Sequence, residues 1–360
     1  MTTTRSTPHS SRDAASERDG TELSWLGTRV ARFLLRRMVG PRRAGGTREI
    51  RLAKFGIDVA DADCRARITG VLRAFFGGFE TGLLSPADVR TTNDLATAVD
   101  TLAPAEHCER LFAPFWHEGA AMAAGARDLL RLRSRARTLA RFGAEIAAVG
   151  DPFRFLRYVG LGFWLGFRHG TRARCVDAAA AALAERGLRH LVHDGYGFQV
   201  GFFTLRKRPR VVESLRRFEG FARESAFNGV GRSLWFFYMD RPDVGLLRAR
   251  SFEGDALAVI GGMGLAAAFT RIDQLAIAYA VADELQRAER AAFEKGIRIA
   301  LYCRHANDRR LLDRCVDDLP PALATRARAD LAHAVAVGDA TSASDEFIAE
   351  FHAGCAVAPS

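Results

Sequence analysis

The stretches YVGLGFWLGF (Tyr158–Phe167) and IGGMGLAAAF (Ile260–Phe269) decide the fold expected for this chain of 360 residues. Each combines several glycines with large apolar residues, and aligning Phe167 with Phe269 gives an offset of 102 residues. Glycine lowers helix stability by roughly 1 kcal/mol relative to alanine, so a glycine-rich helix must regain that free energy through close packing. Small residues let two backbones approach, and aromatic side chains fill the adjoining gaps. The pattern therefore predicts Gly-rich helix packing.

The same order of motifs surrounds both stretches. HEGAAMAAG (His117–Gly125) and FNGVGRSLW (Phe227–Trp235) precede them, while DGYGFQVGFF (Asp194–Phe203) and EKGIRIALY (Glu294–Tyr302) follow them. An earlier partial copy reads FFGGFETGL at Phe75–Leu83. We therefore expect a mostly α-helical fold, in which a helical unit of about 100 residues is duplicated within one globular domain.

The N-terminal segments differ from the rest of the chain in composition. Residues 1–22 are rich in Ser, Thr, Asp and Arg and predict a disordered tail. Residues 23–46 predict a basic amphipathic helix followed by a linker. Within this segment, residues 25–37 are compatible either with docking on the domain or with peripheral contact to a membrane surface.

The body of the chain is expected to be one cytoplasmic domain. We predict the duplicated α-helical domain over residues 47–335, with repeat halves at about 110–205 and 220–305, followed by a C-terminal tail over 336–360. The six cysteines form no CxxC motif, and their wide spacing favours reduced thiols in the cytoplasm. The longest uncharged apolar run, 256–270, is shorter than the roughly 20 residues that span a bilayer.

The strongly basic balance does not indicate a nucleic-acid partner. The formal net charge is +10, but nearly all basic residues are arginines that are scattered along the chain. Nucleic-acid binding is expected from basic residues gathered on one face or in a recognised motif. Arginine-rich helical faces exposed to solvent account for this charge more simply.

No cofactor and no metal are expected. VIGGMGLAA (Val259–Ala267) has the GxGxxA spacing of a dinucleotide-binding turn, but Gln274–Arg298 looks continuously helical and offers no second strand. A dinucleotide-dependent oxidoreductase is therefore only a second alternative. Histidines, cysteines and carboxylates do not show the spacing of a zinc or magnesium site. The nucleophile-elbow and P-loop patterns are also missing from the sequence.

Acidic or amide residues stand beside the motif glycines in both halves. Because burial raises the pKa of a carboxyl group, Glu118 and Asp194 are the candidate catalytic residues, suited to orient a substrate or move a proton. The alternative is that these acids cap helices or pair with arginines such as Arg232 and Arg298. Aromatic and polar residues nearby are the candidate substrate-binding residues: Phe198, Gln199, Phe202, Asn228, Trp235 and Phe236.

The motifs also carry a family resemblance. They occur in the order HEGAAMA (117–123), YVGLGF (158–163), DGYGF (194–198), GVGRSLWF (229–236) and GGMGLAAAF (261–269). Over roughly Arg48–Ala306 the chain thereby resembles the domain-of-unknown-function family numbered 1702. The resemblance implies a context in actinobacterial secondary metabolism, notably enediyne polyketide biosynthesis, and it attaches no reaction. One departure stands out, because Gln199 and Val200 in GFQVGFF replace the His and Glu of the family's usual GFHEGYF.

Residues and resemblance together lead to one expected function. The chain is expected to be an accessory protein of bacterial secondary-metabolite biosynthesis that acts on or binds an apolar polyene or polyketide intermediate. The alternative is a non-catalytic protein that binds a synthase. The expected partners are therefore an apolar small molecule or biosynthetic enzymes.

Overall fold

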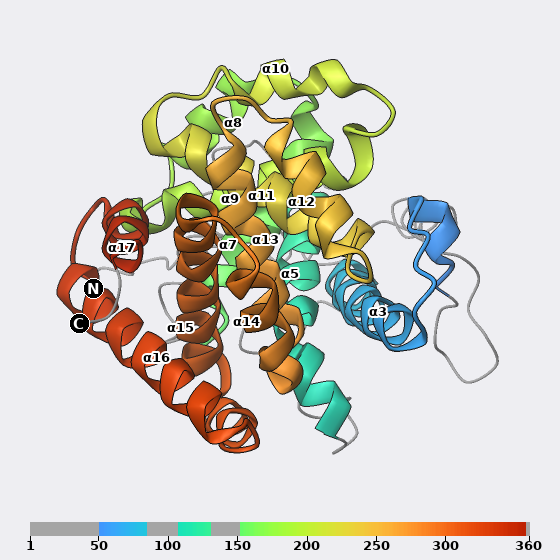
Figure 1. Ribbon diagram of the computed structural model, residues 1–360. Coiled ribbons are helices and arrows are strands. Elements are labelled where there is room, and N and C mark those ends of the chain that lie inside the picture. Colours follow the sequence, from blue (N-terminus) through green and yellow to red (C-terminus); the bar gives the residue numbers. More distant parts are fainter. Residues whose placement is uncertain (1–49, 85–106, 131–151, 358–360) are drawn as a thin grey trace, which may run out of the picture.

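The computed structural model describes residues 50–84, 107–130 and 152–357, and every regular element within these ranges is helical (Figure 1). The helices pack around one continuous apolar core, so the expectation of a mostly α-helical single domain is confirmed. The predictions for residues 1–22 and 23–46, including membrane contact through 25–37, lie outside the described residues.

Long helices alternate with short connecting ones. The long helices are α3 (Ala62–Leu84), α5 (His107–Leu130), α7 (Arg154–His169), α9 (Arg189–Gln199), α11 (Gly220–Phe237), α13 (Ala256–Thr270), α15 (Arg287–Asp317) and α16 (Pro321–Thr341). The shorter helices are η2 (Leu52–Phe55), α8 (Ala173–Ala180), η3 (Arg186–Leu188), the π-helix η4 (Val200–Thr204), η5 (Pro209–Val211), α10 (Val212–Leu215), α12 (Pro242–Arg250), η6 (Ile272–Gln274), α14 (Leu275–Asp283) and α17 (Phe347–Cys355).

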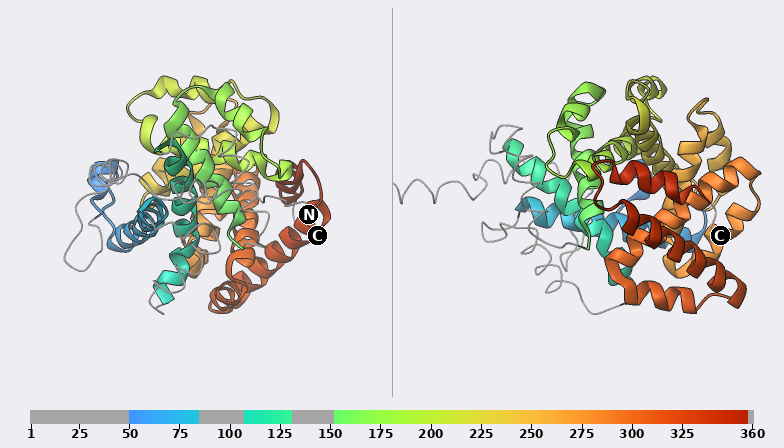
Figure 2. Two further views of the ribbon diagram at one scale, coloured as in Figure 1. Left: turned by 180° about the vertical axis from the view of Figure 1, so that it is seen from behind. Right: turned by 90° about the vertical axis from the view of Figure 1, so that its left-hand side faces the viewer.

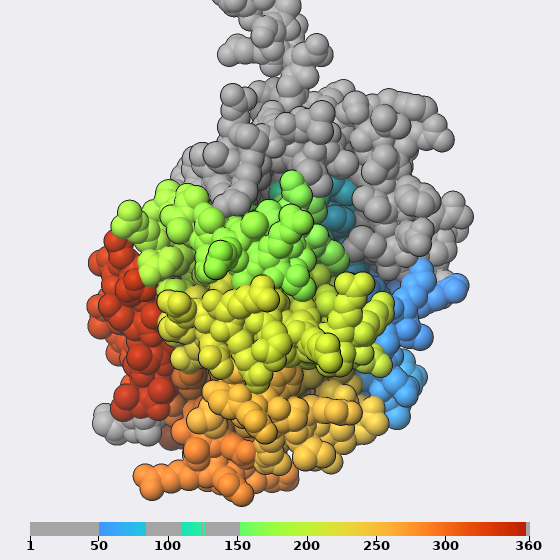
Figure 3. Space-filling model, turned by 90° about the horizontal axis from the view of Figure 1, so that it is seen from above, coloured from blue at the N-terminus to red at the C-terminus, as the bar shows by residue number. Residues whose placement is uncertain are grey.

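Helices α3, α5, α7, α9, α11, α13 and α15 form one run, in which each packs against the next. Neighbours in this run point the same way: Gly160 of α7 lies against Glu118 of α5, and Gly125 of α5 lies further along against Trp164 of α7. Between α7 and α15, short helices on the periphery return the chain to the start of the next long helix. Figure 3 shows the result as successive bands of sequence across one face of the molecule.

In this run every pair of consecutive helices except α5 and α7 makes a reciprocal approach of glycine to backbone, and α5 and α7 make it in one direction, through Gly160. A methyl group added to Gly229 of α11 would lie 2.0 Å from the carbonyl oxygen of Asp194 in α9, and one added to Gly197 of α9 would lie 1.8 Å from that of Ala226 in α11. Only glycine permits such an approach, which also allows weak Cα–H···O contacts. The glycines that meet a neighbouring carbonyl in this way are Gly78, Gly119, Gly160, Gly162, Gly195, Gly197, Gly229, Gly231, Gly262, Gly264 and Gly296.

These glycines show a shorter period than the duplicated halves that the sequence suggested. The first contact glycines of α5 to α15 are 119, 160, 195, 229, 262 and 296, which lie 41, 35, 34, 33 and 34 residues apart. The 102-residue offset between YVGLGFWLGF and IGGMGLAAAF thus corresponds to three repeat units. Each unit consists of one long helix and the connection that follows it. The expected halves, 110–205 and 220–305, therefore contain three shorter units each, and we infer a serial repeat in which one long helix and its connection form one unit.

The run curves back on itself. Arg67 of α3 forms an ion pair with Asp273 of η6 (Nη1 to Oδ1, 2.6 Å), and the rings of Phe115 in α5 and Phe269 in α13 meet edge to face with centroids 5.5 Å apart. Arg304 of α15 donates to the carbonyl oxygen of Leu111 in α5 (2.9 Å). The first helices of the run therefore contact the last, and the molecule has an interior that an open row of helices would lack.

The C-terminal residues differ from the expected tail over 336–360. Helix α16 continues to Thr341, and α17 packs its apolar face onto the core, with Phe351 only 2% exposed. Arg298 of α15 donates to the Cys355 carbonyl oxygen (2.8 Å), which anchors the end of α17. Figure 2 shows both helices along one side of the molecule.

The helix expected over Gln274–Arg298 is divided. Helix α14 ends at Asp283 and α15 begins at Arg287, with the buried Leu285 in the turn between them. This break makes α14 a connecting helix. Helix α15 itself is interrupted at Asp308, whose backbone is extended (φ −159°, ψ 87°) and whose Oδ1 accepts a hydrogen bond from the Leu311 amide (3.1 Å).

The described residues include no single helix that is both long and apolar enough to cross a membrane. One pair of segments, Ala256–Thr270 and Ile272–Asp283, meets the length and composition together but is bent by 92°.

Candidate functional site

A buried polar cluster lies where α5, α9 and α11 meet. Its centre is Arg232 of α11, which forms ion pairs with Asp194 of α9 through Nη1 and with Glu118 of α5 through Nη2 (3.7 Å to Oε1). All three side chains are at least nine-tenths buried. The glycine contacts explain why both acids lie inside the molecule. Glu118 directly precedes Gly119, which packs α5 against α3, and Asp194 directly precedes Gly195, which packs α9 against α7.

Asn228 completes the cluster one turn before Arg232. With the amide oriented to satisfy both neighbours, its nitrogen donates to Asp194 Oδ2 (3.0 Å) and its oxygen accepts from the Gly262 amide of α13 (3.1 Å). Asp194 thus accepts hydrogen bonds on both carboxylate oxygens, one of them from a guanidinium. Burial raises the pKa of the Asp194 carboxyl group, and the pairing with Arg232 opposes this rise.

Glu118 is the group in the cluster that changes charge near neutral pH. Burial raises the pKa of Glu118 to about 7; Arg232 opposes this rise and the negative charge of Asp194 adds to it. One guanidinium faces two carboxyl groups, and the nearer one, Asp194, compensates its charge. Glu118 therefore holds its proton below about pH 7 and releases it above.

An aromatic-walled cavity adjoins this cluster. Glu118 and Arg232 supply its polar wall, and the ring of Phe198 lies 5.1 Å from the Arg232 guanidinium carbon. The remaining walls come from α3, α5, α7, α9, η4 and α11: Val71, Leu72, Phe75, Phe76, Phe115, Phe163, Phe198, Phe202, Phe203 and Phe236. The cavity holds about 30 Å³, enough for one or two water molecules, so a larger guest requires side chains to move.

A short helix lies over the aromatic wall. Phe55 of η2 is partly exposed and stacks on Phe76 (centroids 5.6 Å apart), and it also contacts Phe202 (5.9 Å). Gly56 ends this helix with a left-handed backbone (φ +69°). Phe202 belongs to the π-helical segment η4, and π-helical turns in proteins are frequent at functional sites.

The structure brings together most, but not all, of the residues that the sequence singled out. Glu118, Asp194 and Asn228 join one polar cluster, and Phe198, Phe202 and Phe236 line the adjoining cavity. Two candidates lie elsewhere. Gln199 packs its side chain against Gly166 of α7, and the Trp235 indole nitrogen donates to Thr270 Oγ1 (3.1 Å) and ties α11 to α13.

Sequence reasoning placed Arg232 only as a partner for buried acids, and the structure gives it that role at the centre of the cluster. It missed five aromatic residues of the wall: Phe75, Phe76, Phe115, Phe163 and Phe203. A signal for two of them was available in the partial motif FFGGF at 75–79. Phe115 had no such signal. It belongs to α5, and α5 faces α9 across the cavity only because the whole run of helices is curved.

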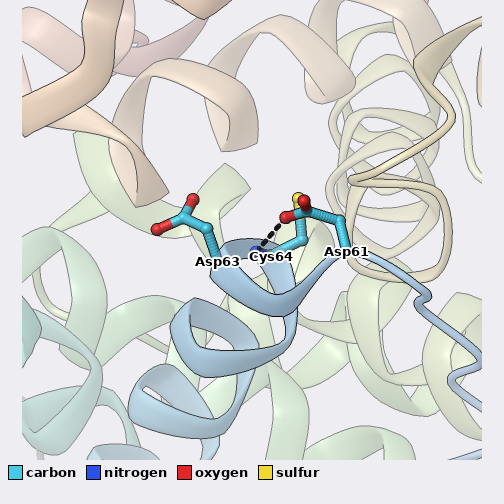
Figure 4. A group of neighbouring side chains, drawn as sticks. All are labelled: Asp61, Asp63 and Cys64. Atoms are coloured by element: carbon cyan, nitrogen blue, oxygen red, sulfur yellow. Dashed lines mark hydrogen bonds between the residues drawn. The ribbon is translucent and has the colours of Figure 1, made fainter.

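A second polar group lies at the start of α3, where ligand atoms of Asp61, Asp63 and Cys64 come within 4.8 Å of one another (Figure 4). Asp61 Oδ1 accepts from the Cys64 amide (2.7 Å) and so caps the helix. Arg271 donates to Asp63 Oδ2 (3.0 Å) and to Cys64 Sγ (2.7 Å), and burial raises the pKa of the Cys64 thiol to about 11. A protonated thiol beside a guanidinium favours a helix cap over a cation site.

The GxGxxA pattern at Val259–Ala267 lies inside helix α13. Gly262 and Gly264 face the backbone of α11 and α15, where an added methyl group would come within 1.9 and 2.1 Å of carbonyl oxygens. The packing interpretation of these glycines is thus confirmed. In a phosphate-binding turn the glycines lie between a strand and a helix, where their backbone can contact the phosphate. The GxGxxA pattern of this chain therefore does not support a dinucleotide-dependent oxidoreductase.

Comparison with known proteins places the chain in a family. Curated proteins gave no match, and solved structures gave none. The family model described as "Protein of unknown function (DUF1702)" matches residues 31–340, which include the repeated glycine helices and the buried cluster. Because this match covers most of the 360 residues, the chain belongs to the DUF1702 family of proteins of unknown function.

Proposed function

We propose that this protein serves bacterial secondary metabolism of the enediyne polyketide type, where it binds an apolar polyene or polyketide intermediate and transfers a proton to it from Glu118. One observation carries the proposal: a fully buried carboxyl group with a pKa of about 7 faces a cavity walled by phenyl rings. A general acid is most effective when its pKa lies near the working pH.

The chemistry follows from the residues around that acid. Protonated Glu118 donates its proton to a carbon–carbon double bond of the bound guest, and the phenyl rings of Phe163 and Phe198 stabilise the cation that forms. Arg232, 3.7 Å from Glu118 Oε1, stabilises the carboxylate left behind. Loss of a proton from the rearranged cation to this carboxylate restores the acid, so the net change is an isomerisation or ring closure.

Entry of the guest requires the wall to open. The cavity of about 30 Å³ is far smaller than a polyene, and Phe55 of η2 is the partly exposed ring over the wall. We infer that the guest enters on this side by displacing η2. The segment is short and has the flexible residue Gly56 at its end.

The test is complementation of a deletion strain. Deleting the gene should remove the pathway product, as measured by mass spectrometry, and the wild-type gene should restore it. Glu118→Gln should fail to restore it, because the amide keeps the shape of the site but cannot donate an acidic proton. The matched control is Glu289→Gln, at a partly buried glutamate that pairs with Arg250 outside the site; it should restore the product fully.

The pH dependence gives a second readout. Since the protonated form is the donor, turnover by the purified protein should fall as pH rises through about 7. An infrared titration of the wild-type carboxyl band should show the same transition, and Glu118→Gln should lack it. A product that survives gene deletion would overturn the pathway assignment, whereas a product that survives Glu118→Gln alone would overturn only the proton transfer.

A non-catalytic binding protein is the second candidate. It is favoured by the small cavity and by the complete pairing of Asp194 with Arg232 and Asn228. It also fits the presence of Gln199 and Val200 at positions where the family pattern carries a His and a Glu. In this case the deletion abolishes the product while Glu118→Gln restores it, and a synthase of the same pathway is recovered with the purified protein.

A further inference from the structure

A second cavity lies at the interruption of α15, separate from the aromatic one. It holds about 330 Å³ and is bounded by α5, η6 and both parts of α15. Its apolar wall includes Ile272, Leu311 and Leu312, and its polar wall includes Arg304 and Asn307. An apolar cavity of roughly 150 Å³ already binds benzene, so this one is large enough for a small organic molecule.

Arg304 brings an uncompensated positive charge to this cavity. The side chain is 3% exposed, and its guanidinium donates to the carbonyl oxygens of Phe269 and Leu111, with no carboxylate partner among the described residues. Asp273, whose negative charge acts on Arg304 through space, is itself bound by Arg67 through two hydrogen bonds (2.6 and 2.8 Å). A buried charge without a counter-ion is costly in free energy.

The other charged groups on the cavity wall do not neutralise Arg304. Arg110 and Asp308 neutralise each other in an ion pair (2.5 Å) at the rim, where Arg110 is half exposed. The three hydrogen bonds of Arg304 to backbone carbonyl oxygens use one proton each on Nε, Nη1 and Nη2, so a second N–H remains on each terminal nitrogen. The lining therefore has a net charge of +1, and it carries N–H donors that no acceptor among the described residues uses.

Asn307 adds a polar contact of the opposite kind. Its nitrogen donates to the Pro152 carbonyl oxygen (2.5 Å), which sets the orientation of the amide. Its buried Oδ1 has no donor among the residues that the structure describes. The wall thus offers a charged donor and an acceptor that a hydroxyl group or a water molecule can satisfy.

We propose that this cavity is a binding site for a small apolar carboxylic acid in its ionised form. The carboxylate pairs with Arg304, the hydrocarbon part contacts Ile272, Leu311 and Leu312, and the site is independent of the proton transfer assigned to Glu118. A guanidinium fork favours a carboxylate because both of its oxygens can be bound.

The experiment is a titration of the full-length protein with hexanoate, followed by ligand-observed NMR and calorimetry. Hexanoate should bind saturably at one site at millimolar or lower concentration. Hexylammonium, which has the same hydrocarbon chain and the opposite charge, should not bind. Absence of saturable hexanoate binding, or equal binding of hexylammonium, would overturn the proposal.

Two variants locate the site. Arg304→Met removes the charge, and Ala113→Phe fills the cavity from α5 while keeping Arg304. Each should weaken hexanoate binding at least about tenfold. The matched control Ala329→Phe adds the same ring at an exposed position of α16 and should bind as the wild type does.

Folding of each variant is checked by circular dichroism. If Arg304→Met fails to fold because two backbone carbonyl oxygens lose their donor, the binding of hexanoate by Ala113→Phe tests whether the cavity is the site. Wild-type affinity in a folded Ala113→Phe protein would show that hexanoate binds elsewhere and would end the proposal.

Discussion

Gly77 and Gly78 are neighbours in α3, but only Gly78 faces the backbone of α5. A methyl group on Gly78 would lie 1.9 Å from the Trp116 carbonyl oxygen, whereas one on Gly77 would make ordinary contacts of 3.7 Å with the Trp116 ring. The glycine-rich motifs therefore contain two kinds of glycine. One kind permits helix contact, and the other only lowers the stability of its own helix.

This difference predicts opposite effects of the same substitution. Gly78→Ala should lower the free energy of unfolding by about 2–3 kcal/mol or more, because backbone has to move to admit the methyl group. Gly77→Ala should leave it unchanged or raise it by up to about 1 kcal/mol through better helix propensity. Urea unfolding monitored by circular dichroism measures both. Equal effects at the two positions would contradict the packing described for α3 and α5.

At the residue scale, the sequence identified the polar residues of the buried cluster better than the aromatic residues of the cavity wall. Glu118 and Asp194 could be selected because each stands directly before a motif glycine, and that glycine places it inside the molecule. Trp235 could not be separated from Phe236 by pattern. The two are adjacent in α11, and only the rotation of that helix about its axis turns Phe236 to the cavity and Trp235 to Thr270.

Helix α17 lies where a C-terminal tail was expected, although the sequence contains a signal for a buried helix. Phe347, Ile348, Phe351 and Cys355 recur at helical spacing, and all four are buried in the structure. The ring of Phe351 in α17 packs against the ring of Tyr302 in α15 (centroids 4.6 Å apart). The segment therefore belongs to the core of the domain.

A single truncation tests this assignment. Phe351→Ala should lower the free energy of unfolding by about 3–5 kcal/mol, the usual cost of deleting a buried phenyl ring. Val357→Ala, at a side chain 63% exposed, should change it by no more than about 0.5 kcal/mol. Thermal or urea unfolding supplies the comparison, and a Phe351→Ala protein as stable as the Val357→Ala protein would show that α17 does not support the core.

The break between α14 and α15 had no comparable signal. Residues 284–286 are Glu, Leu and Gln, and none of them disfavours a helix. The chain turns there because Leu285 is buried and because α14 must return to the start of the next long helix. A tertiary requirement overrides local propensity at this position.

At the scale of the whole molecule, closure of the run distinguishes this protein from an open helical array. In an open array each unit contacts only its neighbours, and terminal units open first. Here Arg67 and Arg271 connect the start of α3 to the η6 turn, and Arg304 connects α15 to α5. The interior cavities lie inside this closed arrangement.

The closure predicts a local effect of a substitution at Arg67. Arg67→Met should cost about 1.5–3 kcal/mol, since it removes hydrogen bonds between charged groups. Hydrogen exchange should accelerate in α3 and the η6 turn and stay slow in α11, which lies in the middle of the run. Arg73→Met, at an exposed position of the same helix, should leave exchange unchanged. Uniform acceleration in all helices would show that the ends are not locally closed.

The sequence by itself determined the helical class, the close glycine contacts and the two acids of the buried cluster, Glu118 and Asp194. These depend on local properties: helix propensity, the missing side chain of glycine and the order of motifs along the chain. The repeat length, the aromatic wall and the pairing of Glu118 and Asp194 with one guanidinium were decided only by tertiary structure. They depend on how each helix is rotated against the next and on the curvature summed over seven helices, which no single stretch of sequence encodes.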